Sequence, residues 1–380
     1  MFDAHSVQYR EAAVTECSRA AMGGDWAWSA LLCLGAVAAS GAVGPVDARP
    51  ASDATAAPAV AGPVERAVGT DTRLFEDPTR DNWTGTGQRP LHTRLWYPHE
   101  RRAPGGEEAS REAAAAVDTP PVATAGARLP LVLVSHGSGS EAAHMDWLAR
   151  TLATKGYLVA AVDHRGSAED ELHSQPAPSD HFGWERAIDL RTVLDLLLDD
   201  TTFGPLIDRA RIGAAGFSLG GTTVLWLSGA RLDLAHLRRT APPVPPAMAP
   251  AIERLLQLPE RNAVAREAQA RAEQSHRDPR IRSVFALAPA MGFGFNEAGL
   301  QDITVPVRIV VGRDDPVTPP DANARVFASA IAGAEYLELS GERGHYTART
   351  PDGQRARELA EVAALAVEFF DATLALRGGP

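Results

Sequence analysis

The stretch Arg211-Ile-Gly-Ala-Ala-Gly-Phe-Ser-Leu-Gly-Gly221 decides the fold of this chain. Its apolar part, Ile212 to Phe217, favours a strand, and the segment from Thr222 to Leu227 favours a helix. Between them, Gly216-Phe-Ser-Leu-Gly220 matches the G-x-S-x-G pattern of a sharp turn that presents a serine. We expect a strained backbone at Ser218, with the flanking glycines leaving room for it. The pattern also arises by chance, so the rest of the chain must supply partners for a nucleophile.

Short apolar runs separated by helical patterns surround this turn. We expect strands at Leu91–Pro98, Leu129–Val134, Tyr157–Val162, Ile281–Ala288, Val305–Val311 and Tyr336–Leu339, and helices at Ala143–Lys155, Trp184–Leu198, Asp321–Ala332 and Ala356–Leu374. Strands that alternate with helices form βαβ units. The sequence therefore predicts an α/β fold with a mostly parallel central sheet, flanked by helices on both faces.

The first 48 residues are typical of a targeting segment. No charged residue occurs from Trp26 to Val46, and small residues follow, as a signal peptidase prefers. We therefore expect a signal peptide and an exported protein, periplasmic or secreted. An uncleaved membrane tether through residues 26–46 is the alternative, because 21 uncharged residues are long enough to span a bilayer.

Composition divides the remaining chain and excludes some functions. We interpret residues 49–84 as a flexible Ala- and Pro-rich linker, residues 85–380 as the folded domain, and residues 100–128 as an exposed loop or insertion. The net charge of −11 argues against nucleic acid as a partner. Both cysteines, Cys17 and Cys33, precede the folded domain, so its body contains no zinc cluster, disulfide or catalytic thiol. No cofactor is implied.

Residues 230–278 interrupt the alternation of strands and helices. They comprise a Pro-rich stretch, Thr240 to Pro250, and a helix-like run from Ala251 to Glu273. An insertion at this point of the chain would lie above the carboxyl ends of the strands, close to Ser218. Two interpretations stay open: a lid that moves over the substrate, or a helical excursion that packs on the core.

Partners for Ser218 follow two later strands. A serine nucleophile needs a base and an orienting carboxylate, in the chain order Ser, Asp or Glu, His. The strand at Val305–Val311 leads into Gly312-Arg-Asp-Asp-Pro, and the next strand leads to Gly344-His345. We predict Asp315 as the acid and His345 as the base. The alternative acid, Asp314, would instead cap the turn or the following helix.

Two backbone N–H groups would stabilise the negative charge that develops on a substrate oxygen. One belongs to Leu219, directly after the nucleophile, and the other to the loop after the Leu129–Val134 strand. In that loop we predict Ser138, with Gly137 or Gly139 as alternatives.

The other histidines are expected to be structural. We expect His136 to brace the loop by hydrogen bonds and His164 to be structural or to line the pocket. The acidic and histidine residues between Asp163 and His173 match no metal-binding spacing, so no metal is predicted.

Together these motifs resemble those of the α/β-hydrolases. The resemblance covers roughly residues 85–375 and is carried by Ser135-His-Gly-Ser-Gly, Asp163-His164, the turn around Ser218, Gly312-Arg-Asp-Asp-Pro and Gly344-His345. Trp96-Tyr97-Pro98 and Glu185-Arg-Ala-Ile-Asp189 make the chain similar to the bacterial predicted dienelactone hydrolases and the plasma-type platelet-activating-factor acetylhydrolases.

The resemblance implies a role for each site residue. It implies Ser218 as nucleophile, Asp315 as acid, His345 as base, and the amides of Ser138 and Leu219 as the oxyanion hole. Two positions depart from the pattern. Such loops often carry an apolar residue where this chain has Ser138, and a dienelactone hydrolase proper uses a cysteine nucleophile, which argues against dienelactone as the substrate.

The sequence therefore predicts a serine esterase that forms an acyl-enzyme on Ser218 and acts on small-acyl or lipid-like esters. Three alternatives stay open. They are a lipase or cutinase-like polyester hydrolase, a peptidase or amidase with the same triad, and a non-catalytic binding protein on a hydrolase fold.

Overall fold

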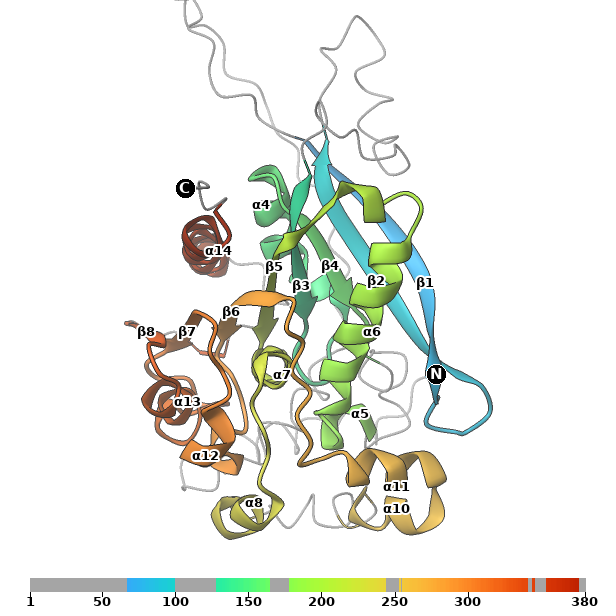
Figure 1. The fold of residues 1–380 in the computed structure, drawn as a ribbon. Coiled ribbons are helices and arrows are strands. Elements are labelled where there is room, and N and C mark those ends of the chain that lie inside the picture. Colours follow the sequence, from blue (N-terminus) through green and yellow to red (C-terminus); the bar gives the residue numbers. More distant parts are fainter. Residues whose placement is uncertain are drawn as a thin grey trace, which may run out of the picture.

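An eight-stranded sheet forms the centre of the computed structural model, with the strand order β1-β2-β4-β3-β5-β6-β7-β8 (Figure 1). The structure describes residues 67–99, 128–164, 178–243, 253, 255–340, 344–345 and 353–375. The predicted targeting segment (1–48) and most of the predicted loop at 100–128 lie outside these residues. Among the helices of the described part, none has the length and apolar character that a membrane crossing requires.

Six neighbouring strands run parallel. They are β3 (Leu129–Ser135), β4 (Leu158–Val162), β5 (Ile207–Phe217), β6 (Ile281–Leu287), β7 (Val307–Gly312) and β8 (Glu335–Leu339). β4 and β7 are buried along their whole length, as expected for strands between two helical layers, and β7 is apolar apart from Arg308. The predicted parallel sheet is confirmed.

Two antiparallel strands complete one edge of the sheet. β2 (Gln88–His99) pairs with β4, and β1 (Ala67–Asp81) pairs with β2 along nearly its whole length. The prediction of a linker over residues 49–84 is wrong for 67–81, because these residues form β1. The strand has partners on one side only and alternates half-buried with exposed residues, so no apolar run marks it in the sequence. The folded domain therefore includes β1.

Helices cover both faces of the sheet, as predicted. On β5, a Cβ atom added to Gly213 would contact Phe370 of α14 (Gly353–Thr373), whereas one added to Gly216 would meet the start of α7 (Leu219–Ser228). Residues at odd and even positions of a strand face opposite sides, so α14 and α7 cover opposite faces. The helix α4 (Asp146–Thr154) packs with α14, and α6 (Glu185–Asp199) packs with α7 (Figure 1).

Shorter elements connect these layers. They are η3 (Ala142–Met145), α5 (Pro178–His181), η5 (Gly204–Leu206), η6 (Gly292–Gly294), α12 (Glu297–Leu300), η7 (Pro320–Ala322) and α13 (Ala324–Ala330). The helix expected at 321–332 is thus divided into η7 and α13. Asn323, with φ −132° and ψ −91°, leaves the helical conformation between them.

The insertion contains short helices. In its described part these are α8 (Leu234–Thr240), α10 (Leu258–Arg261) and α11 (Ala263–Ala270), in place of the longer helical run expected from 251 to 273. Asn262 separates the last two, because its extended backbone ends α10 and its side chain accepts the Ala265 N–H at the start of α11.

The helix α11 is fastened to the rest of the domain. The Nε1 atom of Trp184 donates to the Ala268 carbonyl at 2.8 Å, and Nδ2 of Asn262 donates to the Trp83 carbonyl at 2.7 Å. Ala265 and Ala268 are fully buried. These contacts favour the packed interpretation of the insertion for α11.

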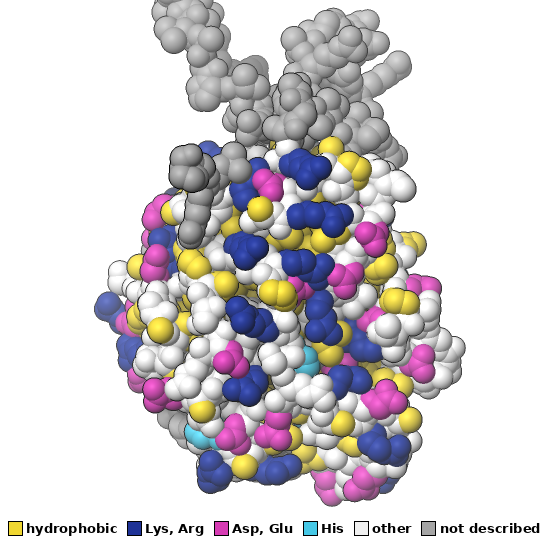
Figure 2. Space-filling model, viewed as in Figure 1, with side chains coloured by type: hydrophobic (Ala, Val, Ile, Leu, Met, Phe, Trp, Pro, Cys, Tyr) yellow, Lys and Arg dark blue, Asp and Glu magenta, His cyan; other side chains and the backbone are white. Residues whose placement is uncertain are grey.

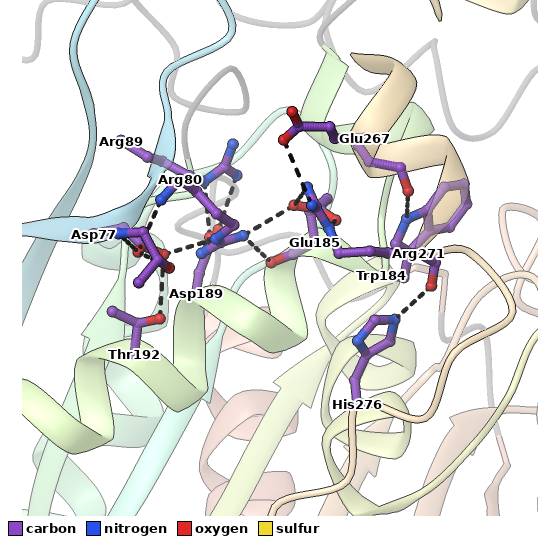
Figure 3. A network of polar contacts seen from close by, with 12 residues as sticks. Asp77, Arg80, Arg89, Trp184, Glu185, Asp189, Thr192, Glu267, Arg271 and His276 are labelled. Atoms are coloured by element: carbon purple, nitrogen blue, oxygen red, sulfur yellow. Dashed lines mark hydrogen bonds and ion pairs between the residues drawn. The ribbon is translucent and has the colours of Figure 1, made fainter. Parts of the chain in front are cut away.

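Buried ion pairs join the β1–β2 hairpin, α6 and α11 (Figure 3). Asp189 of α6 accepts from Arg80 at 2.6 Å and from Arg89 at 2.8 Å. Glu185, one turn earlier, pairs with Arg80 at 3.1 Å and with Arg271, directly after α11, at 2.8 Å. Breaking a buried pair leaves an uncompensated charge. The network therefore fixes the position of the first turn of α6.

The outer surface carries both signs of charge. Figure 2 shows basic side chains spread among acidic and apolar ones over the face that α6 and β1 form in Figure 1. This mixture occurs although the whole chain has a net charge of −11.

Candidate active site

Ser218 lies at the sharp turn between β5 and α7. Its φ of 56° and ψ of −120° are a conformation that side-chain-bearing residues rarely adopt. Its N–H donates to the Leu287 carbonyl at 2.9 Å, and its carbonyl accepts from Ala290 N–H at 3.2 Å. Strain of this kind persists where surrounding contacts enforce it, and it is common at functional sites. The strain expected from the sequence is present.

The glycines beside Ser218 permit the turn. A Cβ atom at Gly216 would overlap with the Gly220 carbonyl, and one at Gly220 would overlap with the carbonyl of Ser135 at the end of β3. Residues with side chains are therefore excluded at both positions. This close approach brings the β3 end next to the start of α7.

Asp315 and His345 contact each other directly. Oδ2 of Asp315 lies 2.8 Å from Nδ1 of His345 and also accepts from the Thr318 hydroxyl at 2.8 Å. The other oxygen, Oδ1, accepts two backbone N–H groups, those of Val317 at 2.8 Å and Thr318 at 3.0 Å. Asp314, the alternative acid, is exposed.

The charge state of Asp315 suits an orienting group. Burial alone would raise the pKa of this carboxyl, but the charge and hydrogen bond of His345 and the Thr318 donors lower it below its ordinary value. Asp315 is therefore ionised at neutral pH. It holds a proton on Nδ1 of His345 and leaves Nε2 as the acceptor.

His345 lies beside the turn that carries Ser218. Its ring centroid is 4.7 Å from that of Phe217, the residue before Ser218, and its carbonyl accepts from Nη2 of Arg355 at 2.6 Å. The Nε2 atom is buried and has no hydrogen-bond partner among the described residues. Buried polar atoms without a partner are uncommon, and a catalytic role is one reason for them.

Leu219 and the loop that contains Ser138 both lie next to Ser218 in the fold. Leu219 is the first residue of α7, so its N–H is one of the free donors at that helix terminus. A Cβ atom added to Gly137 would lie 3.4 Å from Cβ of Ser218, which places the loop after β3 beside the nucleophile. In the same loop, the Ser138 hydroxyl donates to Oδ2 of Asp180 at 2.5 Å.

His136 has the bracing contacts that the sequence predicted. Its Nε2 accepts the N–H of His164 at 3.2 Å, and its Nδ1 lies 2.8 Å from the Gly137 carbonyl. Burial, together with the charge of Arg186, lowers the pKa of His136 well below its ordinary value. The ring is therefore neutral. Because Nε2 accepts the His164 N–H, the ring proton lies on Nδ1, which donates to the Gly137 carbonyl.

A second series of hydrogen-bonded Asp, His and Ser side chains lies in the core. Nδ1 of His164 is 2.9 Å from Oδ2 of Asp189, and Nε2 is 2.9 Å from Oγ of Ser135. Burial and the charge of Arg186 lower the pKa of His164 to about 3, although Asp189 opposes the shift. All three side chains are fully buried. His164 is therefore a structural residue, as the sequence suggested.

Three contacts of the site went unnoticed in the sequence. Thr318 orients Asp315, Arg355 holds the His345 backbone, and Arg186 contacts the loop after β3. Thr318 had a recognisable signal, because a carboxylate that accepts the N–H two and three residues later is a common turn pattern. The two arginines had none, since helical arginines are usually solvated.

Metal-ion ligation has no support in the described residues, which contain no group of three or more His, Cys, Asp or Glu side chains that could hold an ion. Most of the acidic and histidine residues noted between 163 and 173 lie outside the described part of the chain.

The strand order and the strained serine between β5 and α7 define an α/β-hydrolase, and the chain is a hydrolase of this superfamily. A family model described as serine aminopeptidase, S33, matches residues 127–347, more than half of the chain. The chain belongs to this family.

Two similar proteins are named as an acetylhydrolase and an esterase. The platelet-activating factor acetylhydrolase of Cavia porcellus is 28% identical over an alignment of 138 residues, which takes in 26% of this chain and 32% of that protein. The chain thus matches about a third of the length of this curated relative. The ferulic acid esterase from Streptomyces cinnamoneus has a TM-score of 0.52 and 23% identity, and the alignment covers 85% of this chain and 94% of that one. This likeness shows the shared fold. Together, the matches confirm the resemblance inferred from the sequence.

Proposed function

We propose that this protein is a serine hydrolase that cleaves carboxylic esters through an acyl-enzyme on Ser218. The observation that carries the proposal is the state of His345. Asp315 holds its Nδ1 at 2.8 Å, while its Nε2 is buried without a partner among the described residues, beside the turn that presents Ser218. A base held in one tautomer and placed next to a strained serine is the arrangement that activates a hydroxyl group.

These positions support the following acylation step. Nε2 of His345 takes the proton of the Ser218 hydroxyl as Oγ attacks the ester carbonyl. The resulting oxyanion accepts hydrogen bonds from the N–H groups of Ser138 and Leu219. His345, now charged and stabilised by Asp315, gives its proton to the leaving alcohol, and the acyl group remains on Ser218.

Deacylation repeats the same steps with water. His345 takes a proton from a water molecule that attacks the acyl-enzyme, and the same two N–H groups stabilise the second oxyanion. Collapse of this intermediate returns the proton to Ser218 and releases the carboxylic acid. His345 thus transfers the proton in both half-reactions, first from Ser218 to the alcohol and then from water back to Ser218.

Ester substrates are supported by the similar proteins. One is named for the acetyl group that it removes and the other for a ferulic acid ester. Small-acyl or lipid-like esters are therefore the substrate class that we propose.

The family supplies a second candidate function. Its description names a serine aminopeptidase, so peptide bonds are the alternative substrate of the same triad. Parallel assays with a p-nitrophenyl ester and a matched amino-acid p-nitroanilide separate the two. Turnover of the anilide at a rate equal to or above that of the ester would favour the peptidase.

The proposal is tested by labelling the purified protein with a fluorophosphonate and locating the adduct by mass spectrometry. We expect one adduct, on Ser218, and loss of at least about 10⁴-fold in kcat for Ser218→Ala with the fold preserved. Ester turnover that survives in folded Ser218→Ala contradicts the proposed nucleophile.

A further inference from the structure

Arg186 is a buried cation that contacts the backbone of the loop after β3. Its side chain is fully buried, and its Nη2 donates to the His136 carbonyl at 2.6 Å. The same Nη2 lies 3.5 Å from the Gly137 carbonyl. These two carbonyls belong to the peptides that carry the N–H groups of Gly137 and Ser138.

Burial of the guanidinium group at this position lowers the stability of the fold. Its Nε and Nη1 atoms are buried and have no partner among the described residues, and burial lowers the pKa of Arg186 to about 10. A buried cation that is only partly hydrogen-bonded destabilises a fold compared with an apolar side chain of similar size. Such a residue fits a functional constraint better than a contribution to stability.

The helix α6 holds the backbone of Arg186 in a fixed position. Glu185 and Asp189, which flank it on α6, are held by the ion pairs with Arg80 and Arg89 described above (Figure 3). These contacts hold the backbone of the first turn of α6, from which the Arg186 side chain reaches the loop after β3.

A contact to the Gly137 carbonyl also orients the Ser138 N–H, because both groups belong to one peptide. A trans peptide is planar, so its C=O and N–H groups point in opposite directions. The Gly137 carbonyl accepts from the ring N–H of His136 at 2.8 Å, and Arg186 binds the preceding carbonyl, that of His136, at 2.6 Å and lies 3.5 Å from that of Gly137. The N–H of Ser138, on the same peptide, then points away from that cluster. Rotation of this peptide would remove one donor from the oxyanion hole.

We propose that Arg186 is a positioning residue that, together with His136, holds the Gly137–Ser138 peptide in the orientation that presents the Ser138 N–H to the oxyanion. The inference rests on the proposed function, because it assigns a support to the oxyanion hole of that reaction. Arg186 does not touch the substrate. It acts through the loop.

The test compares Arg186→Met, Arg186→Lys and the wild type in p-nitrophenyl acetate hydrolysis. We expect Arg186→Met to lower kcat about tenfold to a hundredfold, with KM within about threefold, because an interaction made in the transition state is weakened. The Ki of a trifluoromethyl ketone, which forms a charged tetrahedral adduct with serine, should rise by a similar factor. Arg186→Lys, which keeps a cationic donor, should recover part of the loss.

Arg191→Met is the matched control. Arg191 lies five residues further along α6 and is partly exposed, so the same substitution there should leave kcat and Ki unchanged. A folded Arg186→Met variant with the kcat of Arg191→Met, or with raised KM and unchanged kcat, overturns the inference and leaves the proposed function intact. Failure of the proposed function is seen separately, as wild-type hydrolysis that does not depend on Ser218.

A second variant keeps the test decisive if Arg186→Met does not fold. His136→Leu removes the ring N–H that donates to the same Gly137 carbonyl. We expect kcat to fall by about threefold to tenfold, with a matching rise in Ki for the ketone. Unchanged values in folded His136→Leu overturn the inference.

Discussion

The Nδ1 atom of His164 lies 2.9 Å from Oδ2 of Asp189, in a part of the core that solvent does not reach. The contact resembles the one between His345 and Asp315, at 2.8 Å, and each histidine has a serine nearby in the fold. The two Asp-His pairs differ in the hydrogen bonding of the histidine Nε2 atom. In His164 this atom is occupied by the Ser135 hydroxyl at 2.9 Å, whereas in His345 it is unpartnered among the described residues.

Ser135 should therefore be inert toward serine-directed reagents. We expect a fluorophosphonate to modify Ser218 and leave the Ser135 peptide unmodified, since the buried hydroxyl is out of reach. In Ser135→Ala, labelling of Ser218 should remain complete, with stability lowered by about 1 kcal/mol for the lost hydrogen bond. Peptide mass spectrometry checks the first expectation and urea unfolding the second. An adduct on Ser135 would contradict the structural assignment.

Asp189 should contribute strongly to stability. Burial would raise the pKa of Asp189, but the charges of Arg89 and Arg80 and the hydrogen bond from His164 lower it well below its ordinary value. Asp189→Asn leaves these buried cations with less compensation, and we expect a loss of about 3–5 kcal/mol in urea unfolding. The control is Asp208→Asn, whose partly exposed pair with Arg211 should account for less than about 1 kcal/mol. Similar losses in both variants would argue against a special role for the buried network.

The strained backbone at Ser218 predicts an order of stability among nucleophile variants. Ser218→Ala keeps a side chain at φ 56° and ψ −120°, whereas glycine adopts this conformation without steric strain. We expect Ser218→Gly to be more stable than Ser218→Ala by about 1 kcal/mol in urea unfolding. Equal or lower stability of the glycine variant would mean that the turn is relaxed in solution.

Asp315 should make the domain sensitive to acid. Its folded pKa lies below the ordinary value of 3.8, so the stability that it contributes is fully present above that value. This contribution is lost as the pH falls through the lower, folded pKa. We expect the stability difference between wild type and Asp315→Asn to be constant near neutral pH and to shrink below about pH 4. Thermal unfolding of both proteins across this range checks the expectation, and a difference that grows on acidification would contradict it.

The attachment of α11 can be followed by amide hydrogen exchange. Because Trp184 and Asn262 tie α11 to the domain, its amides should exchange slowly, at rates close to those of α6 rather than those of a mobile loop. Trp184→Phe removes the Nε1–H donor to Ala268 and should speed exchange in α11 while leaving α14 unchanged. Fast exchange in wild-type α11 would instead favour a lid that opens.

The sequence predicts the strands that are buried on both faces of the sheet. It does not predict the edge strand β1, which is half-buried or exposed along most of its length. β3 and β4 are almost wholly apolar and β7 is apolar apart from Arg308, a pattern that predicts strands of a covered parallel sheet. β1 lies at the edge, with Asp71, Arg73 and Glu76 interspersed along it, so its pattern resembles that of a polar linker. A strand of this kind is recognised by its pairing, which the sequence does not display.

Some residues of the candidate site could also be predicted from the sequence, and others could not. Ser218, Asp315 and His345 follow strand ends in a fixed order, which local motifs reveal. Arg186 lies in the first turn of α6, next to charged Glu185, where solvent exposure is the ordinary expectation, and its burial comes with its contact to the loop after β3. Supporting contacts of this kind come from tertiary structure and leave no spacing to detect.

The inclusion of residues 67–81 in the sheet has a practical consequence for recombinant expression. A gene that begins at codon 85, where the composition suggests a boundary, would omit β1 and with it Arg80. The remaining protein would expose the long backbone edge of β2 and leave Glu185 and Asp189 short of a cation. Such a truncation is expected to give aggregated material, whereas a gene that begins before codon 67 preserves the edge of the sheet.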